Sequence, residues 1–245
     1  MKKGILLLLS LCIFSVIAIS QVYVPGYEGD LPGKNVDKLE ISTPDKSKAL
    51  EEADYLDNKP GPYMVSKIID VDISMENAGT WDILNDGASV WRLELHLPGA
   101  EAVNILYDTF LLPEGSYLCL YNANKKQLTD PYTSSHNTKP GKHTSTEIIE
   151  GETVFIEYVQ PAGVSGEPQL QISGLSWFYR GVDALVGAYR NERPTGFGDS
   201  GDCNVNVNCA EGANWQEEKH SVALIYIPTG MGGGFCSGSL INNTA

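Results

Sequence analysis

Ser200 is the residue whose setting most directly suggests covalent chemistry, because it lies in the run Gly198-Asp199-Ser200-Gly201. Glycines on both sides of a serine leave backbone N–H groups free to form an oxyanion hole beside a nucleophilic hydroxyl. Such a serine needs a histidine base and an orienting carboxylate, and in enzymes that use this motif both precede it on a completed barrel. A different kind of domain precedes Ser200, as shown below. We therefore interpret the run as a polar linker of small residues.

The four histidines do not suggest a second catalytic or metal site. None has a ligand spacing such as His-Glu-x-x-His. We expect all four to be solvated surface side chains: His96, His136, His143 and His220. Asp70-Val71-Asp72 offers two carboxylates, but it lacks the glycine and the final glutamate of a calcium loop, so we interpret it as the outward face of a strand. The sequence predicts no metal and no cofactor.

The composition is that of an ordinary globular protein. The 245 residues are 42% hydrophobic and 20% charged, which excludes disordered, collagen-like and coiled-coil proteins. Asp and Glu number 31 against 17 Lys and Arg, for a formal charge of −14. A surface this acidic repels phosphate backbones, so no nucleic-acid partner is expected.

The first twenty residues have the pattern of a signal peptide. Lys2 and Lys3 form a basic start, and an almost wholly apolar run follows from Ile5 to Ile19. Small residues at Ala18 and Ser20 predict cleavage between Ser20 and Gln21. The alternative is an uncleaved membrane anchor, but the run is short for a membrane span. We expect a secreted protein with no membrane contact after cleavage.

If the protein is exported, its cysteines are expected to form disulfides, because disulfides form outside the cytoplasm. Cys203 and Cys209 bound an alternating run that predicts a strand, and over that length they would lie about 20 Å apart. A disulfide requires Cα atoms within about 7 Å, so these two should not pair with each other. Cys119 fits a free thiol in a strand core. With Cys236 an odd number remains in the last segment: either one is free, or partners lie beyond Ala245.

Residues 65–180 predict an antiparallel β-sandwich. Alternation over 90–97 places Trp91, Leu93, Leu95 and Leu97 on one face and Arg92, Glu94 and His96 on a polar face. Further strands are expected at 65–73, 102–110, 116–121, 153–159 and 169–175. Short strands separated by turns, with no helix between them, are typical of a sandwich whose sheets meet water on one side.

The segments on either side of the sandwich differ from it. Residues 21–64 form an acidic leader rich in proline and glycine, with a helix predicted at 45–56, capped by Thr43 or Asp45, or else a mobile leader. Residues 181–198 have no apolar period, so we predict a linker with a processing site, the cut falling within 185–202. Beyond it, three strands and a glycine-rich turn at 230–234 are too few to bury a core, which predicts the unfinished start of a second β domain.

The last segment resembles a known family. The runs that carry the resemblance are Cys203-Asn-Val-Asn-Val-Asn-Cys209-Ala-Glu-Gly, then Trp215 and Ser221-Val-Ala-Leu-Ile, and finally Cys236-Ser-Gly-Ser-Leu-Ile-Asn-Asn-Thr-Ala245. Together they are similar to the mature start of bacterial lysyl endopeptidases, which are secreted trypsin-like serine proteases with a double β-barrel. More loosely, Ile73–Trp81 and Ser89–Leu93 resemble the pro-region sandwich of Bacteroidetes-type precursors.

The resemblance carries implications for the cysteines and the catalytic residues. It implies that Cys203 and Cys209 pair with cysteines further along, and that Cys236 is bridged to the cysteine directly after the catalytic histidine. That histidine, in a Thr-Ala-x-His-Cys context, is expected soon after Ala245, followed by the aspartate and the serine. No catalytic residue is therefore assigned within these 245 residues.

These observations predict an all-β chain: a β-sandwich pro-region followed by the first strands of an incomplete trypsin-like double β-barrel, which starts at about residue 199. The resemblance implies a parent endopeptidase that cleaves proteins after Lys or a similar basic residue, with this chain inactive alone. Its partners would be protein or peptide substrates and, for the pro-region, its own protease domain. The alternative is a secreted binding or adhesion module with an exposed aromatic cluster at Trp177, Phe178 and Tyr179. We expect instead that these three aromatics close the sandwich core.

Overall fold

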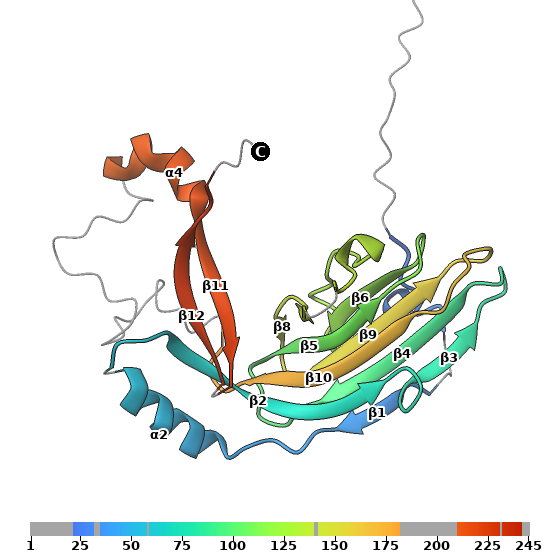
Figure 1. Ribbon diagram of the computed structural model, residues 1–245, viewed down its shortest axis with the longest axis horizontal. Coiled ribbons are helices and arrows are strands. Elements are labelled where there is room, and N and C mark those ends of the chain that lie inside the picture. The colour runs from blue at the N-terminus through green and yellow to red at the C-terminus, as the bar shows by residue number, and fades with distance from the viewer. Residues whose placement is uncertain are drawn as a thin grey trace, which may run out of the picture.

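The computed structural model describes residues 22–31, 35–57, 59–139, 142–181, 210–230 and 232–241. Its fold is all-β, as the sequence predicts, and is built from two sheets that share one hydrophobic core (Figure 1). We refer to the sheet that contains β4 as sheet A and to the sheet that contains β2 as sheet B.

Sheet A has the strand order β1-β4-β9-β6, and β3 pairs with part of β4. Its pairs are antiparallel except that β1 runs parallel to β4, with Leu39 opposite Leu95. The strands span Asp37–Glu40 (β1), Thr80–Ile83 (β3), Ser89–His96 (β4), Tyr117–Asn122 (β6) and Thr153–Gln160 (β9).

Sheet B has the order β11-β12-β2-β10-β5-β7, and β8 also pairs with β5. All of its pairs are antiparallel. The strands span Tyr63–Ser74 (β2), Ala102–Leu111 (β5), Thr144–Ser145 (β7), Ile149–Glu150 (β8), Gln169–Phe178 (β10), Val222–Thr229 (β11) and Gly232–Ser239 (β12).

The core lies between the two sheets and is formed by alternate residues of each strand. Trp91, Leu93 and Leu95 of β4 face Ile105 of β5 and Leu175 of β10 in one buried cluster. Full burial of a side chain of this size stabilises the fold by about 1.5–3 kcal/mol. The alternation predicted for residues 90–97 is thereby confirmed on its apolar face.

The predicted helix of the leader is α2, Lys46–Asp57. Asp45 caps it, since its Oδ1 accepts the Lys48 backbone N–H at 2.9 Å. Ala49 and Ala53 are buried in the sandwich core, so the alternative of a mobile leader is wrong for this segment. The remaining helical elements are short: α1 (Pro25–Glu28), α4 (Gln216–Ser221) and the 3-10 helices η1 (Ser134–His136) and η2 (Ala210–Trp215).

The strands expected at 65–73, 102–110, 116–121, 153–159 and 169–175 correspond to β2, β5, β6, β9 and β10. The short strands β1 and β3 were not predicted, because four residues are too few for a clear alternation. The glycine-rich turn expected at 230–234 is wrong in extent, since Gly232–Gly234 already belong to β12. The strand expected at Cys203–Cys209 lies outside the described residues.

Candidate functional site

The first candidate site is the contact between the hairpin, which we define as β11 with β12 (residues 222–239), and strand β2 of the sandwich. The hairpin projects from the β2 end of sheet B, and β12 pairs antiparallel with β2 (Figure 1). In this register Gly233 is opposite Ser66 and Phe235 is opposite Tyr63. The segment that was expected to open a second domain therefore continues the sheet of the first.

Three successive glycines make this close approach possible. A Cβ atom added at Gly232 would lie 2.3 Å from the carbonyl oxygen of Ser66, and one added at Gly234 would lie 2.8 Å from Cβ of Pro62. A Cβ added at Gly233 would lie 2.0 Å from the hydroxyl oxygen of Tyr226. Glycine is required at these positions because only a residue without a Cβ lets the strand approach its neighbours this closely.

Aromatic side chains fill the space between the hairpin and the sandwich. Ring centroids are 5.0 Å apart for Phe178 and Tyr226, and 5.7 Å apart for Tyr226 and Phe235. Phe178 and Phe235 are buried and form one cluster with Val65 and Ala102. Offset and edge-to-face pairs at these distances are favourable beyond the apolar area that they bury.

A polar contact lies beside the aromatic one. The hydroxyl groups of Tyr226 and Ser66 are 2.7 Å apart, and Ser66 is fully buried. Behind Ser66, the buried Ser176 donates from its hydroxyl to Oδ1 of Asn104 at 3.2 Å. Burial raises the pKa of Tyr226, so the phenol stays neutral and keeps its hydrogen. The outer face of sheet B thus offers hydroxyl partners to one tyrosine of the hairpin.

The hairpin is apolar on both of its faces. Val222 and Leu224 lie on the face that carries Tyr226, while Ile225 and Ile227 lie on the opposite face, and all four are exposed. A strand that is apolar on both faces is typical of a sheet that is covered on both sides. The sandwich covers only the part around Tyr226 and Phe235.

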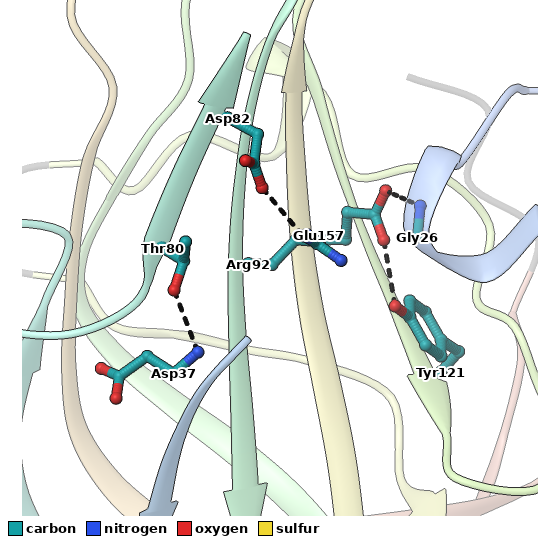
Figure 2. Close-up of polar contacts among 7 residues, drawn as sticks. All are labelled: Gly26, Asp37, Thr80, Asp82, Arg92, Tyr121 and Glu157. Atoms are coloured by element: carbon teal, nitrogen blue, oxygen red, sulfur yellow. Dashed lines mark hydrogen bonds and ion pairs between the residues drawn. The ribbon is translucent and has the colours of Figure 1, made fainter. Parts of the chain in front are cut away.

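The second candidate site is a buried polar cluster on the outer face of sheet A, shown in Figure 2. It lies beneath the strap, which we define as Val22–Asp30. Val24 of the strap is fully buried against Cys119 and Tyr121 of β6. The strap therefore covers the face of β6 that points away from the core.

Glu157 is the buried carboxylate of this cluster. Its Oε1 accepts the Gly26 backbone N–H at 2.7 Å, and its Oε2 accepts the Tyr121 hydroxyl at 3.0 Å (Figure 2). Burial raises the pKa of Glu157, and the two donors and the nearby Arg92 oppose that rise only in part. The carboxylate holds the strap and is closed to solvent, so no substrate reaches it.

Arg92 forms a buried ion pair in the same cluster. One guanidinium nitrogen lies 2.8 Å from Oδ2 of Asp82, and the two side chains are only 5% and 4% exposed (Figure 2). The sequence placed Arg92 on a face that meets water, and this expectation is wrong. The strap and β3 cover that part of sheet A, and the charge is retained because it is paired.

The histidines do not form a catalytic set. Oδ1 of Asp108 lies 3.0 Å from Nδ1 of His143 and accepts the Ser173 hydroxyl at 2.6 Å. In a nucleophilic triad the histidine lies between the serine and the carboxylate, whereas here the serine bonds the carboxylate directly. His143 and Asp108 are also 76% and 52% exposed, so solvent screens the pair. His96 bonds Thr153 across the sheet at 2.9 Å.

Several predicted positions have definite outcomes. Cys119 is a free buried thiol, as expected, and burial raises its pKa to about 12. Cys236 is free and partly exposed in β12. Asp72 belongs to β2 and accepts from Gln171, as the strand interpretation requires. In the part of the chain that the structure describes, no three His, Cys, Asp or Glu residues are grouped for a metal.

Other predicted positions lie outside the described residues. They are Ser20 and Gln21 of the cleavage site, Cys203, Cys209, and the run Gly198–Gly201. Trp177, Phe178 and Tyr179, which only the alternative of a binding module requires to be exposed, are buried: Trp177 and Tyr179 lie in the core, as expected, and Phe178 contacts the hairpin. The surface that an adhesion module would use is therefore absent at these three residues.

The sequence did not predict that the strap covers the outer face of sheet A or that the hairpin packs against sheet B. A signal for the first was present in Tyr117-Leu-Cys-Leu-Tyr121, which is apolar at every position and so predicts a strand covered on both faces. The strap itself has no such signal, since its helix α1 is only four residues long.

Comparisons with known proteins identify relatives of the chain. Residues 197–245, which include the hairpin, match the family model described as "Lysyl endopeptidase, C-terminal domain". The chain is also 27% identical over 174 residues to the lysyl endopeptidase of Pseudomonas aeruginosa strain PAO1. This similarity covers 66% of the chain but only 36% of that relative. The chain is thus similar, over these regions, to proteins of the lysyl endopeptidase family.

Proposed function

We propose that the chain is the N-terminal part of a secreted serine endopeptidase precursor whose parent enzyme cleaves peptide bonds after Lys or a similar basic residue. The observation that carries this proposal is the family match over residues 197–245. These residues contain the hairpin, which pairs with strand β2 of the preceding sandwich. A serine nucleophile activated by histidine and aspartate would lie in the precursor after Ala245.

The proposed organisation has five parts: a signal peptide (1–20), a leader (21–64), a sandwich pro-region (65–180), a linker with the processing site (181–198) and the start of the protease domain (199–245). The contacts of the strap, β1 and α2 with the sandwich support a pro-region that includes the leader. In the described part of the chain, no helix is both long enough and apolar enough to span a membrane.

Hydrolysis of a lysine ester tests the proposed activity. We expect no turnover from residues 21–245 and turnover from the longer precursor that its gene encodes, after the linker is cut. A substitution of the first histidine in the Thr-Ala-x-His-Cys context should abolish that turnover. Hydrolysis by the 245-residue chain itself, or a longer precursor that lacks this context, would contradict the proposal.

A further inference from the structure

We propose that sheet B of the sandwich carries a strand-capture site, formed by the edge of β2 together with Ser66 and Phe178, which holds the hairpin noncovalently. The partner is named on the basis of the proposed function: it is the first hairpin of the catalytic domain. The site would keep the two parts joined after the linker is cut.

Backbone pairing is the first component of the site. A peptide that adds a strand to a sheet gains main-chain hydrogen bonds at the edge that it covers. β12 does this at β2 through Gly233, Gly234 and Phe235. Two strands alone are marginally stable in water, so the hairpin depends on the sheet to which it adds.

Side-chain recognition is the second component. Phe235 is buried between Phe178 and Tyr226, at centroid distances of 6.2 Å and 5.7 Å. The Tyr226 hydroxyl reaches Ser66, which lies on β2 itself. Recognition therefore combines an aromatic contact that gives affinity with a hydroxyl pair that fixes the register.

The glycines are the third component, because they restrict which strand fits. A side chain at Gly232 would overlap the Ser66 carbonyl, and one at Gly234 would overlap Cβ of Pro62. The site accepts a Gly-Gly-Gly-Phe strand with its paired tyrosine and excludes strands that carry side chains at the first and third of these positions.

Cleavage in place tests the capture site. A recognition sequence for a specific protease is inserted between Thr195 and Gly196 of the full chain, which is purified, cut and passed over a gel-filtration column. We expect the fragment that contains the hairpin to elute with the sandwich. Separate elution of the two parts from the otherwise unaltered chain would overturn the inference.

Variants confined to the hairpin show whether the contact is specific, and they leave the sandwich unaltered. After cutting, Phe235→Ala should weaken association at least about 100-fold, because it removes a buried aromatic ring. Tyr226→Phe, which removes only the hydroxyl group, should weaken it about fivefold. Leu240→Ala is the matched control, since Leu240 is 69% exposed, and should bind as the parent does.

Equal association of the Phe235→Ala and Leu240→Ala proteins would overturn the assigned contact. Thermal unfolding of each uncut protein verifies that the sandwich is folded before the comparison. The test measures association and not hydrolysis, so its failure is distinct from failure of the proposed function. A precursor that hydrolyses lysine esters although its cut parts separate would refute the capture site alone.

Discussion

Gly26 donates its backbone N–H to Oε1 of Glu157 at 2.7 Å, across 131 residues of sequence. This bond ties the strap to β9, a central strand of sheet A. The approach leaves no room for a side chain, because a Cβ atom at Gly26 would lie 2.3 Å from Oε2 of Glu157 and 2.9 Å from the Tyr121 hydroxyl oxygen. Both obstacles are parts of buried residues.

We expect Gly26→Ala to displace the strap and to uncover Cys119. In the parent this thiol is buried beneath Val24, and its pKa is raised to about 12, so it reacts slowly with alkylating agents. Labelling with iodoacetamide at pH 8, followed by peptide mass mapping, should show faster modification of Cys119 in the variant.

Two comparisons make this labelling result specific to the strap. Cys236 is partly exposed and should be modified at the same rate in both proteins. Glu28→Ala changes an exposed residue in the same turn of the strap and should leave Cys119 protected. Unchanged protection of Cys119 in Gly26→Ala would show that the strap tolerates a side chain there.

Arg92→Met should destabilise the protein by about 3–5 kcal/mol, because it leaves the buried Asp82 and Glu157 without the cation that they face. Unfolding in urea measures this loss. Adding Asp82→Leu should recover part of it, since one of the two buried carboxylates that faced Arg92 is then removed.

The matched control for the ion pair lies on the surface. Lys46 and Glu101 are 37% and 47% exposed, so Lys46→Met should cost less than about 1 kcal/mol. A cost for Arg92→Met as small as that for Lys46→Met would mean that the buried pair does not contribute to stability.

Glu157 should make the stability of the fold depend on pH. Burial raises its folded-state pKa above the ordinary value of 4.5, so folding takes up a proton. A raised pKa contributes stability that is present below pH 4.5 and is lost as pH rises through the folded value. Relative to Glu157→Gln, the parent should therefore lose stability as pH is raised from 4.5 toward neutrality, by at most about 1.4 kcal/mol per pH unit. Parallel curves of urea midpoint against pH for the two proteins would contradict this.

The proposed linker makes a prediction for proteolysis. Arg190 and Arg193 lie within the segment that we expect to be cut, whereas Arg92 and Arg180 contact the folded sandwich. Trypsin does not cleave before proline, and Pro194 follows Arg193, so brief digestion should cleave after Arg190 before it cleaves after Arg92 or Arg180. If the first cleavage falls within residues 65–180, the prediction of an accessible linker at residues 181–198 is wrong.

The sequence was sufficient to predict the strands whose apolar residues alternate. In β4, Leu93 and Leu95 are buried as the period of two requires, and the helix α2 follows from Asp45 and the spacing of Ala49 and Ala53. These signals are local, because the residues that carry them lie within one element.

The sequence was not sufficient where burial comes from a distant segment. Arg92 has the pattern of a solvated residue, and only the packing of the strap and β3 makes it buried. Gly232 and Gly233 have the composition of a turn, yet they form a strand because β2 offers a free edge. Such positions are decided by contacts far apart in the chain, which local periodicity does not contain.

The parts of the strand-capture site follow one another along the chain in a useful order. Ser66 and Phe178 both precede Val222, where the hairpin begins. An exported polypeptide emerges N-terminus first, so β2 and β10 can pair before residues 222–239 have emerged. The hairpin can then pair with a sheet that has already formed, and it does not have to fold in isolation.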